Sequence, residues 1–293
     1  MAIEFMREGV RSLDHFVFLP NDLEAAKAQY ENLGFHVRPV SHHIELGSCN
    51  CIIHFATTYI ELIDLSGADA LLSDPYLDRL ACGEGLAHVS LTCADLKTDH
   101  KRMTEIGLAT SPILSAKRHI IMPDGTENYT DSSSFYMWRE DVKYMSLFLC
   151  GHNKPETIFI PEFGIHPNSA IDVIRLVYMS DNPTGDISYF TELYGKLPDN
   201  ISEDKVSFIG FRGDVTDILT PFAATGKYGD NLACEMPYPL KGIGVAMHIS
   251  VHSLDQARAY LLQQKIKVKD WQDGIIIPAS NACGCAIIFE QVP

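Results

Sequence analysis

The chain has 293 residues, of which 46% are hydrophobic and 21% are charged, the proportions of an ordinary globular protein. Its formal net charge of −15, from 38 acidic and 23 basic residues, argues against binding to nucleic acid or to anionic lipid. We find no signal peptide and no apolar run near the roughly 20 residues of a membrane helix, so we expect a cytoplasmic protein of about two domains.

Four segments share one pattern, in which an alternating apolar stretch is followed by a helix. They are LDHFVFLPNDLEAAKAQYENLGF (13–35), LAHVSLTCADLKTDHKRMTEIGL (86–108), DVIRLVYMSDNPTGDISYFTELYG (172–195) and VAMHISVHSLDQARAYLLQQKI (245–266). Alternation with a period of two predicts a strand, and an Asn, Asp or Ser can cap the helix that follows. The first three helices end at Gly34, Gly107 and Gly195. Short apolar runs follow each helix, so the repeating unit is one strand, one helix and about three further strands.

The spacing of these units predicts a duplicated pair. The centres of the four first strands are His15, His88, Arg175 and His248. Within each consecutive pair the centres lie 73 residues apart, whereas 87 residues separate the two pairs. We therefore expect an N-terminal domain over residues 1–150, a connector rich in Pro, Asn and Gly over 151–170, and a C-terminal domain over 171–293.

The phrases LDHFVFLPNDLEAAKAQYENLGF, YIELIDL and AHVSLTCADL resemble the vicinal oxygen chelate superfamily, and SHHIELGSCN resembles its glyoxalase-like branch. This superfamily includes glyoxalase I, fosfomycin- and bleomycin-resistance proteins and extradiol dioxygenases. The resemblance implies an α+β fold. Four βαβββ modules would pair into two half-open barrels of curved, mixed, mostly antiparallel sheet with the helices outside.

The resemblance also implies a divalent metal, Zn, Ni, Mn or Fe(II), inside the first barrel. Its ligands would be His15, Glu61 in YIELI, and His88 in AHVSL. The fourth ligand position falls on Ser146 in KYMSLFLC, which leaves room for water. The residues support this set, because a carboxylate among apolar strand residues is costly to bury unless it is paired or bound to metal. The alternative is that each histidine is a hydrogen-bonded core residue.

Further side chains are candidates for the substrate pocket. The turn SHHIELGSCN would bring His43 and Asn50 to the pocket, although a solvated loop is the alternative for this turn. The predicted substrate-binding residues are His43, Asn50, Tyr59, Ser146 and Cys150. A nucleophilic Cys150 would need a base such as His152, and nothing in the sequence fixes their geometry. For Arg118 we expect a solvated side chain rather than a carboxylate-binding one.

The second pair of modules lacks the metal-ligand pattern of the first pair. Arg175 replaces the first histidine, Asp217 is the best acid available, and His248 remains. Ile288 falls where the last acid would stand. Because a guanidinium is not a metal ligand, we expect no metal in this half.

The resemblance implies a metal-dependent lyase or isomerase of the glyoxalase-like kind, with Glu61 as its catalytic carboxylate, acting on a small oxygen-bearing molecule. Two alternatives stay open: a metal-free protein that binds a small molecule, as resistance proteins do, and an Fe(II) ring-cleaving dioxygenase. The dioxygenase would need a carboxylate where Ser146 stands. The expected partner is a small-molecule substrate or ligand, with no nucleic acid and no membrane, and the sequence is compatible with a homodimer.

Overall fold

The computed structural model describes residues 11–44, 46–68, 76, 79–81, 83–137, 147–233 and 242–292. The first half of the chain holds two modules. Module one comprises β1 (Leu13–Leu19), α1 (Leu23–Asn32), β2 (Ser41–His42), β3 (Cys49–His54) and β4 (Tyr59–Asp64). Module two comprises β5 (Gly85–Thr92), α3 (Leu96–Glu105), β6 (Leu114–Ile121), β7 (Glu127–Met137) and β8 (Leu147–His152).

The second half repeats this order after two short 3-10 helices at Pro155–Thr157 and Pro161–Gly164. Module three comprises β9 (Ala170–Met179), α4 (Ile187–Tyr194), β10 (Asn200–Ile201), β11 (Lys205–Ile209) and β12 (Val215–Leu219). Module four comprises β13 (Ile243–Val251), α6 (Leu254–Gln263), β14 (Lys269–Trp271), β15 (Gly274–Ile277) and β16 (Ala286–Gln291). An additional helix, α5 (Pro221–Tyr228), follows module three.

The two halves build two eight-stranded sheets with the same topology. Their orders are β2-β3-β4-β1-β5-β8-β7-β6 and β10-β11-β12-β9-β13-β16-β15-β14. In every module the last strand runs parallel beside the first strand, and the two first strands of each sheet pair antiparallel. The predicted α+β fold of four βαβββ modules is confirmed.

Local sequence explains where the helices begin and end. The side chains of Asp95 and Ser253 accept backbone N–H groups in the first turns of α3 and α6. The predicted glycines stop the other ends: Gly34, Gly107 and Gly195 have φ angles of +90°, +75° and +67°. A residue with a Cβ resists such angles, so each helix stops and the chain turns back toward the sheet.

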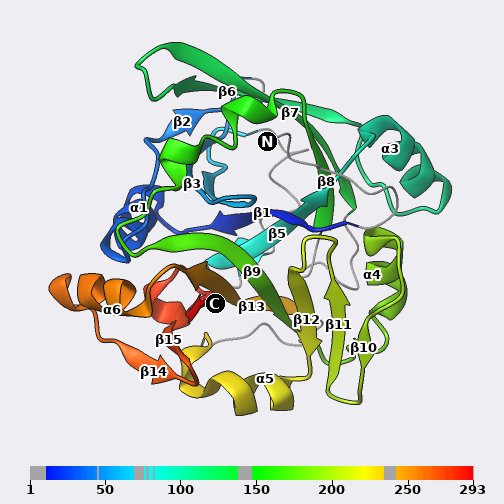
Figure 1. Ribbon diagram of the computed structural model, residues 1–293. Coiled ribbons are helices and arrows are strands. Elements are labelled where there is room, and N and C mark those ends of the chain that lie inside the picture. The colour runs from blue at the N-terminus through cyan, green and yellow to red at the C-terminus, as the bar shows by residue number, and fades with distance from the viewer. Residues whose placement is uncertain are drawn as a thin grey trace.

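Helices from opposite halves of the chain lie side by side (Figure 1), α1 with α6 on one side of the molecule and α3 with α4 on the other. Arg102 of α3 donates to the Glu192 carbonyl of α4 at 2.8 Å. One hydrophobic core includes residues of both sheets, and the rings of Phe35 and Phe289 lie 5.9 Å apart within it. None of the described helices is long and apolar enough to cross a membrane.

The two sheets differ at their edges. In the first sheet the edge strands β2 and β6 meet through an antiparallel bridge between His43 and Arg118, and Ile44 N–H donates to the Lys117 carbonyl at 2.9 Å. The sheet therefore closes almost into a barrel. In the second sheet, α5 covers the corresponding face, where Tyr228 packs in an apolar cluster. The first sheet thus encloses a pocket, whereas a helix fills the second.

The contact between the halves gives a first prediction. Gly284 (φ +71°) lies against the backbone of Glu84, and a Cβ there would overlap the Glu84 carbonyl. Gly213 has a similar φ of +87° with no atom near its would-be Cβ. Gly284→Ala should therefore lower the free energy of unfolding by about 1–3 kcal/mol more than Gly213→Ala does. Urea denaturation measures both, and equal losses would contradict this packing.

Candidate active site

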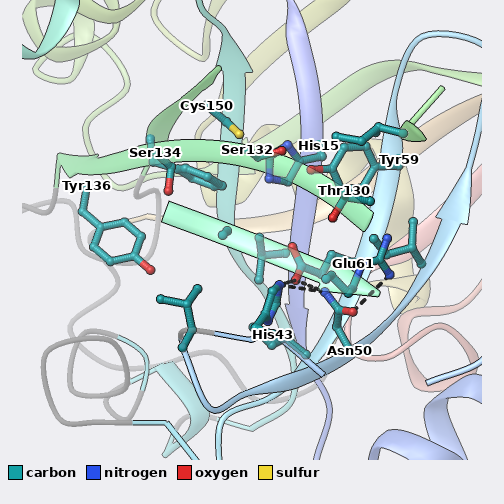
Figure 2. Close-up of a pocket in the computed structure, with 18 of the residues that line it drawn as sticks. His15, His43, Asn50, Tyr59, Glu61, Thr130, Ser132, Ser134, Tyr136 and Cys150 are labelled. Carbon is teal, nitrogen blue, oxygen red and sulfur yellow. Dashed lines mark hydrogen bonds and ion pairs between the residues drawn. The ribbon is translucent and has the colours of Figure 1, made fainter. Parts of the chain in front are cut away.

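A pocket lies on the face of the first sheet opposite to the face that packs on the helices. Phe18 points to the helices and packs edge-on against Tyr30 of α1, at 6.3 Å between ring centroids. Side chains alternate along β1, so His15 and Val17 point to the face opposite Phe18, where they line the pocket. Figure 2 shows Glu61, His43 and Asn50 together at one end of this pocket, and His15, Tyr59 and Cys150 at the other.

Glu61 is buried on β4, with 8% of its surface exposed. Asn50 Nδ2 on the neighbouring β3 donates to Glu61 Oε1 at 2.5 Å. His43 Nε2 lies 3.8 Å from the same oxygen, and its Nδ1 is 2.8 Å from Ser48 Oγ. One oxygen of the carboxylate is therefore fixed by an amide, with an imidazole beside it.

Arg118 reaches this group from β6 across the barrel closure. It is 5% exposed, and its Nη1 donates to Asn50 Oδ1 at 3.2 Å. Asn50 thus stands between Glu61 and Arg118, and no ion pair of 4.0 Å or less joins the two among the described residues. Burial lowers the pKa of Arg118, and Glu61 opposes this. The expectation of a solvated Arg118 is wrong, because the edge strands close over it.

A second polar group surrounds Asp14, which is 2% exposed. Leu13 pairs with Leu91 and His15 with Ser90, so Asp14 is an extra residue in β1, as in a β-bulge. The bulge lets Asp14 accept from His15 Nδ1 at 2.7 Å and from His152 Nε2 at 2.9 Å. Burial alone would raise the pKa of Asp14, but the two imidazoles outweigh it and hold that pKa well below its ordinary value.

His152 connects Asp14 to Cys150. Burial alone would lower the pKa of His152, but Asp14 outweighs it and the pKa is raised well above its ordinary value. His152 Nδ1 lies 3.0 Å from Ser132 Oγ and 3.9 Å from Cys150 Sγ. Burial raises the pKa of Cys150, while His152 opposes this. The thiol faces the pocket with an imidazole behind it.

His88 lies apart from both groups and is fully buried. Its Nδ1 lies 2.8 Å from Tyr76 Oη, and burial lowers the pKa of His88 to about 3, so it is neutral at neutral pH. The register sets His88 opposite Val17, diagonal to His15. Phe148 contacts both imidazole rings, at 4.7 Å from His88 and 5.0 Å from His15 between centroids.

The register also shows which last-strand residues correspond in the four modules. Counted from the first-strand centres, the equivalent residues are Glu61, Phe148, Asp217 and Glu290. The sequence placed the positions of modules two and four at Ser146 and Ile288, two residues too early. Ser146 lies outside the described residues, and Ile288 is a core residue of the second sheet.

In the second sheet these positions form direct ion pairs. Asp217 is fully buried, with Arg175 Nη1 at 2.6 Å and Lys205 Nζ at 3.1 Å. His248 Nδ1 lies 2.5 Å from Glu290 Oε1. The guanidinium of Arg175 therefore balances the negative charge of the buried Asp217 carboxylate.

Most of the residues predicted for the site line the one pocket: His15, His43, Asn50, Tyr59, Glu61 and Cys150. His88 does not line it, and Ser146 is not described. Sequence reasoning missed Asp14, because strict alternation turns it away from His15 and a bulge leaves no period to detect. It also missed Tyr76, which lies in a segment without periodic pattern.

The predicted metal ligands are not assembled as one set. His15, Glu61 and His88 do not form a group whose ligand atoms lie within 4.8 Å of one another. Among the described residues, the group of three that meets this distance is His15, Cys150 and His152. Two imidazoles and a thiolate are ligands that Zn²⁺ accepts.

Comparison with known proteins agrees with this architecture. A family described as glyoxalase-like domain matches residues 13–189, and no curated protein matches the chain. A hypothetical protein from Staphylococcus aureus has a similar structure, with a TM-score of 0.67, 10% identity and coverage of 97% of this chain and 100% of that one. A variant of 4-hydroxymandelate synthase from Streptomyces coelicolor has a TM-score of 0.54, with 8% identity and coverage of 97% of this chain and 92% of that one. The Mn(II)-bound glyoxalase from Novosphingobium aromaticivorans has a TM-score of 0.53, 10% identity and coverage of 96% and 82%. At these identities the likeness extends to the fold alone.

The Asp14 group gives a second prediction. In the metal-free protein His152 should remain protonated above neutral pH, because Asp14 raises its pKa. Asp14→Asn removes that anion, so His152 should titrate near or below the ordinary value of about 6.5. The variant should also lose about 3–5 kcal/mol of stability at neutral pH, since it breaks a buried ion pair. Imidazole nitrogen NMR measures the titration.

The matched control is Asp99→Asn, which removes a carboxylate paired with Arg11 at 2.5 Å instead. It should leave the titration of His152 unchanged. A His152 that is neutral at pH 7 in the unaltered, metal-free protein would contradict the assignment.

Proposed function

Because the chain belongs to the glyoxalase-like domain family, we propose that it is a lyase or isomerase that moves a proton on a small oxygen-bearing molecule. The observation that carries the proposal is that Glu61 is buried without a neighbouring Lys or Arg among the described residues. Its carboxylate is buried in a pocket, yet no Lys or Arg of the described chain lies within 4.0 Å of it. A carboxylate in this state is suited to accept a proton.

The bonding of Glu61 supports the role of a general base. Asn50 fixes Oε1 at 2.5 Å, and Oε2 has no hydrogen-bond partner among the described residues. The amide therefore holds the orientation of the carboxylate while its second oxygen stays open to the pocket. His43, 3.8 Å from Oε1, can exchange a proton with the carboxylate after small movements.

Metal dependence belongs to the proposal, with a ligand set that differs from the predicted one. His15, Cys150 and His152 fit a metal best. Asp14 bonds one nitrogen of each imidazole, which is how carboxylates orient metal-binding histidines. The 3.9 Å from Cys150 Sγ to His152 Nδ1 is near the spacing of about 3.6 Å between sulfur and nitrogen ligands of tetrahedral zinc. A divalent ion supplies polarisation of adjacent substrate oxygens.

A metal-free binding protein is the second candidate. Phe148 occupies the fourth ligand position of the first sheet, and Tyr76 holds His88. Both observations favour a pocket that binds an organic molecule directly. A ring-cleaving dioxygenase has less support, because Phe148 stands where its carboxylate is required.

The third prediction tests the role of Glu61. A panel of 2-oxoaldehyde–thiol adducts and 2-hydroxyketones in D₂O, followed by proton NMR, should reveal incorporation of solvent deuterium. Glu61→Gln keeps an acceptor for Asn50 but cannot take a proton, so it should slow this exchange by about 10²–10⁴-fold. Glu127→Gln, an exposed carboxylate on β7, should leave the rate unchanged. Exchange by Glu61→Gln at the wild-type rate would refute a proton-moving Glu61.

The fourth prediction separates the two ligand sets. Protein purified without a metal-affinity tag is equilibrated with Zn²⁺, and its metal content is measured by elemental analysis. Cys150→Ser and His152→Gln should each weaken Zn²⁺ binding at least about tenfold, whereas His88→Gln should not. The opposite result would favour the sequence-predicted ligands. No uptake by the wild type would put the metal-free binding protein first.

A further inference from the structure

The guanidinium of Arg118 is buried but makes few hydrogen bonds. A guanidinium carries five N–H donors, and within the described chain Arg118 makes one hydrogen bond, to Asn50 Oδ1 at 3.2 Å. The buried polar side-chain atoms that lack any partner belong to His54, Tyr178, Thr191 and Asp214, and none to Arg118. Its unpaired N–H groups therefore reach open space rather than packed protein.

That space consists of two cavities that share Arg118 as a wall. The first is the pocket with Glu61. The second is lined by Arg38, His54 and Phe163, among others, and by no Asp or Glu of the described chain. Arg38 lies over the Phe163 ring at 3.4 Å, so its charge is held at this cavity. Two guanidinium groups therefore line the second cavity, and one of them, Arg118, also lines the pocket that holds Glu61.

A structural ion pair does not account for Arg118. Taking a guanidinium out of water is costly unless an anion is bonded to it. The second sheet shows such a pair, with Arg175 Nη1 at 2.6 Å from Asp217. In the first sheet the Asn50 amide separates Arg118 from Glu61 and bonds to both. The arrangement keeps the Glu61 carboxylate away from the remaining donors of Arg118.

We propose that Arg118 binds a carboxylate of the substrate, which makes the substrate a small 2-oxo or 2-hydroxy acid. This assignment rests on the proposed function for the statement that Glu61 acts on the bound molecule. The planar fork of a guanidinium matches a carboxylate with two parallel hydrogen bonds. Because one amide group spans the gap between Arg118 and Glu61, a carboxylate on the fork brings the proton-bearing carbon, C2 of a 2-hydroxy acid or C3 of a 2-oxo acid, toward Glu61.

Calorimetric titration with pyruvate tests the site directly. Wild type should bind pyruvate and should bind its neutral methyl ester at least about tenfold more weakly. Arg118→Met should weaken pyruvate binding roughly 100-fold, and Arg118→Lys, which keeps the charge but not the fork, should fall between the two. Arg102→Met removes an exposed arginine that pairs with Glu192, and should change nothing.

The outcomes separate this site from the proposed function. Wild-type affinity for pyruvate in both Arg118 variants, or no binding by the wild type, overturns the carboxylate site. Inorganic phosphate that binds more tightly than pyruvate, with the same dependence on Arg118, overturns it in favour of phosphate esters. Glu61→Gln should bind pyruvate within a few-fold of wild type. If that variant also exchanges deuterium normally while the Arg118 variants lose pyruvate, the proposed function fails and the carboxylate site stands.

Discussion

The main-chain bridge between His43 and Arg118 joins the two edge strands of the first sheet. Without it, β2 and β6 would be open edges with unpaired backbone groups, and the pocket would be a trough open to water. Closure shields the polar side chains on the inner face, which strengthens the electrostatic interactions among them. It also carries Arg118, 68 residues away in sequence, to the side of Asn50. The site therefore depends on a contact made by backbone atoms.

The fold could be predicted from the sequence because its signals are local and occur four times. Alternating apolar residues specify each first strand, and Gly34, Gly107 and Gly195 end the helices at angles that other residues resist. The equal spacing within each pair of modules fixed the order of the units. None of these signals depends on contacts distant in sequence, so one amino-acid sequence is sufficient to predict the fold.

The site was less predictable, because it depends on register and on closure. The bulge at Asp14 turns that carboxylate toward His15, although alternation places the two on opposite faces. The last-strand positions of modules two and four shift by two residues, which replaces Ile288 with Glu290. Arg118 looks like an exposed cation in sequence and is buried only because the barrel edges meet. Each of these facts follows from strand pairing over long distances, which composition and period do not encode.

The two halves of the chain allow a comparison that identifies what is special about Glu61. The strand register matches three positions of the second sheet to three of the first: Arg175 to His15, Lys205 to Asn50 and Asp217 to Glu61. Burial alone would raise the pKa of Asp217, but Arg175 and Lys205 outweigh it and keep that group ionised. Glu61 meets an amide where Asp217 meets Lys205. Since the same architecture can place two cations on a buried carboxylate, the absence of any described Lys or Arg within 4.0 Å of Glu61 is a property of this pocket. The proposed role of Glu61 as a general base rests on this difference, because a carboxylate that no described Lys or Arg neutralises can accept a proton from a bound molecule.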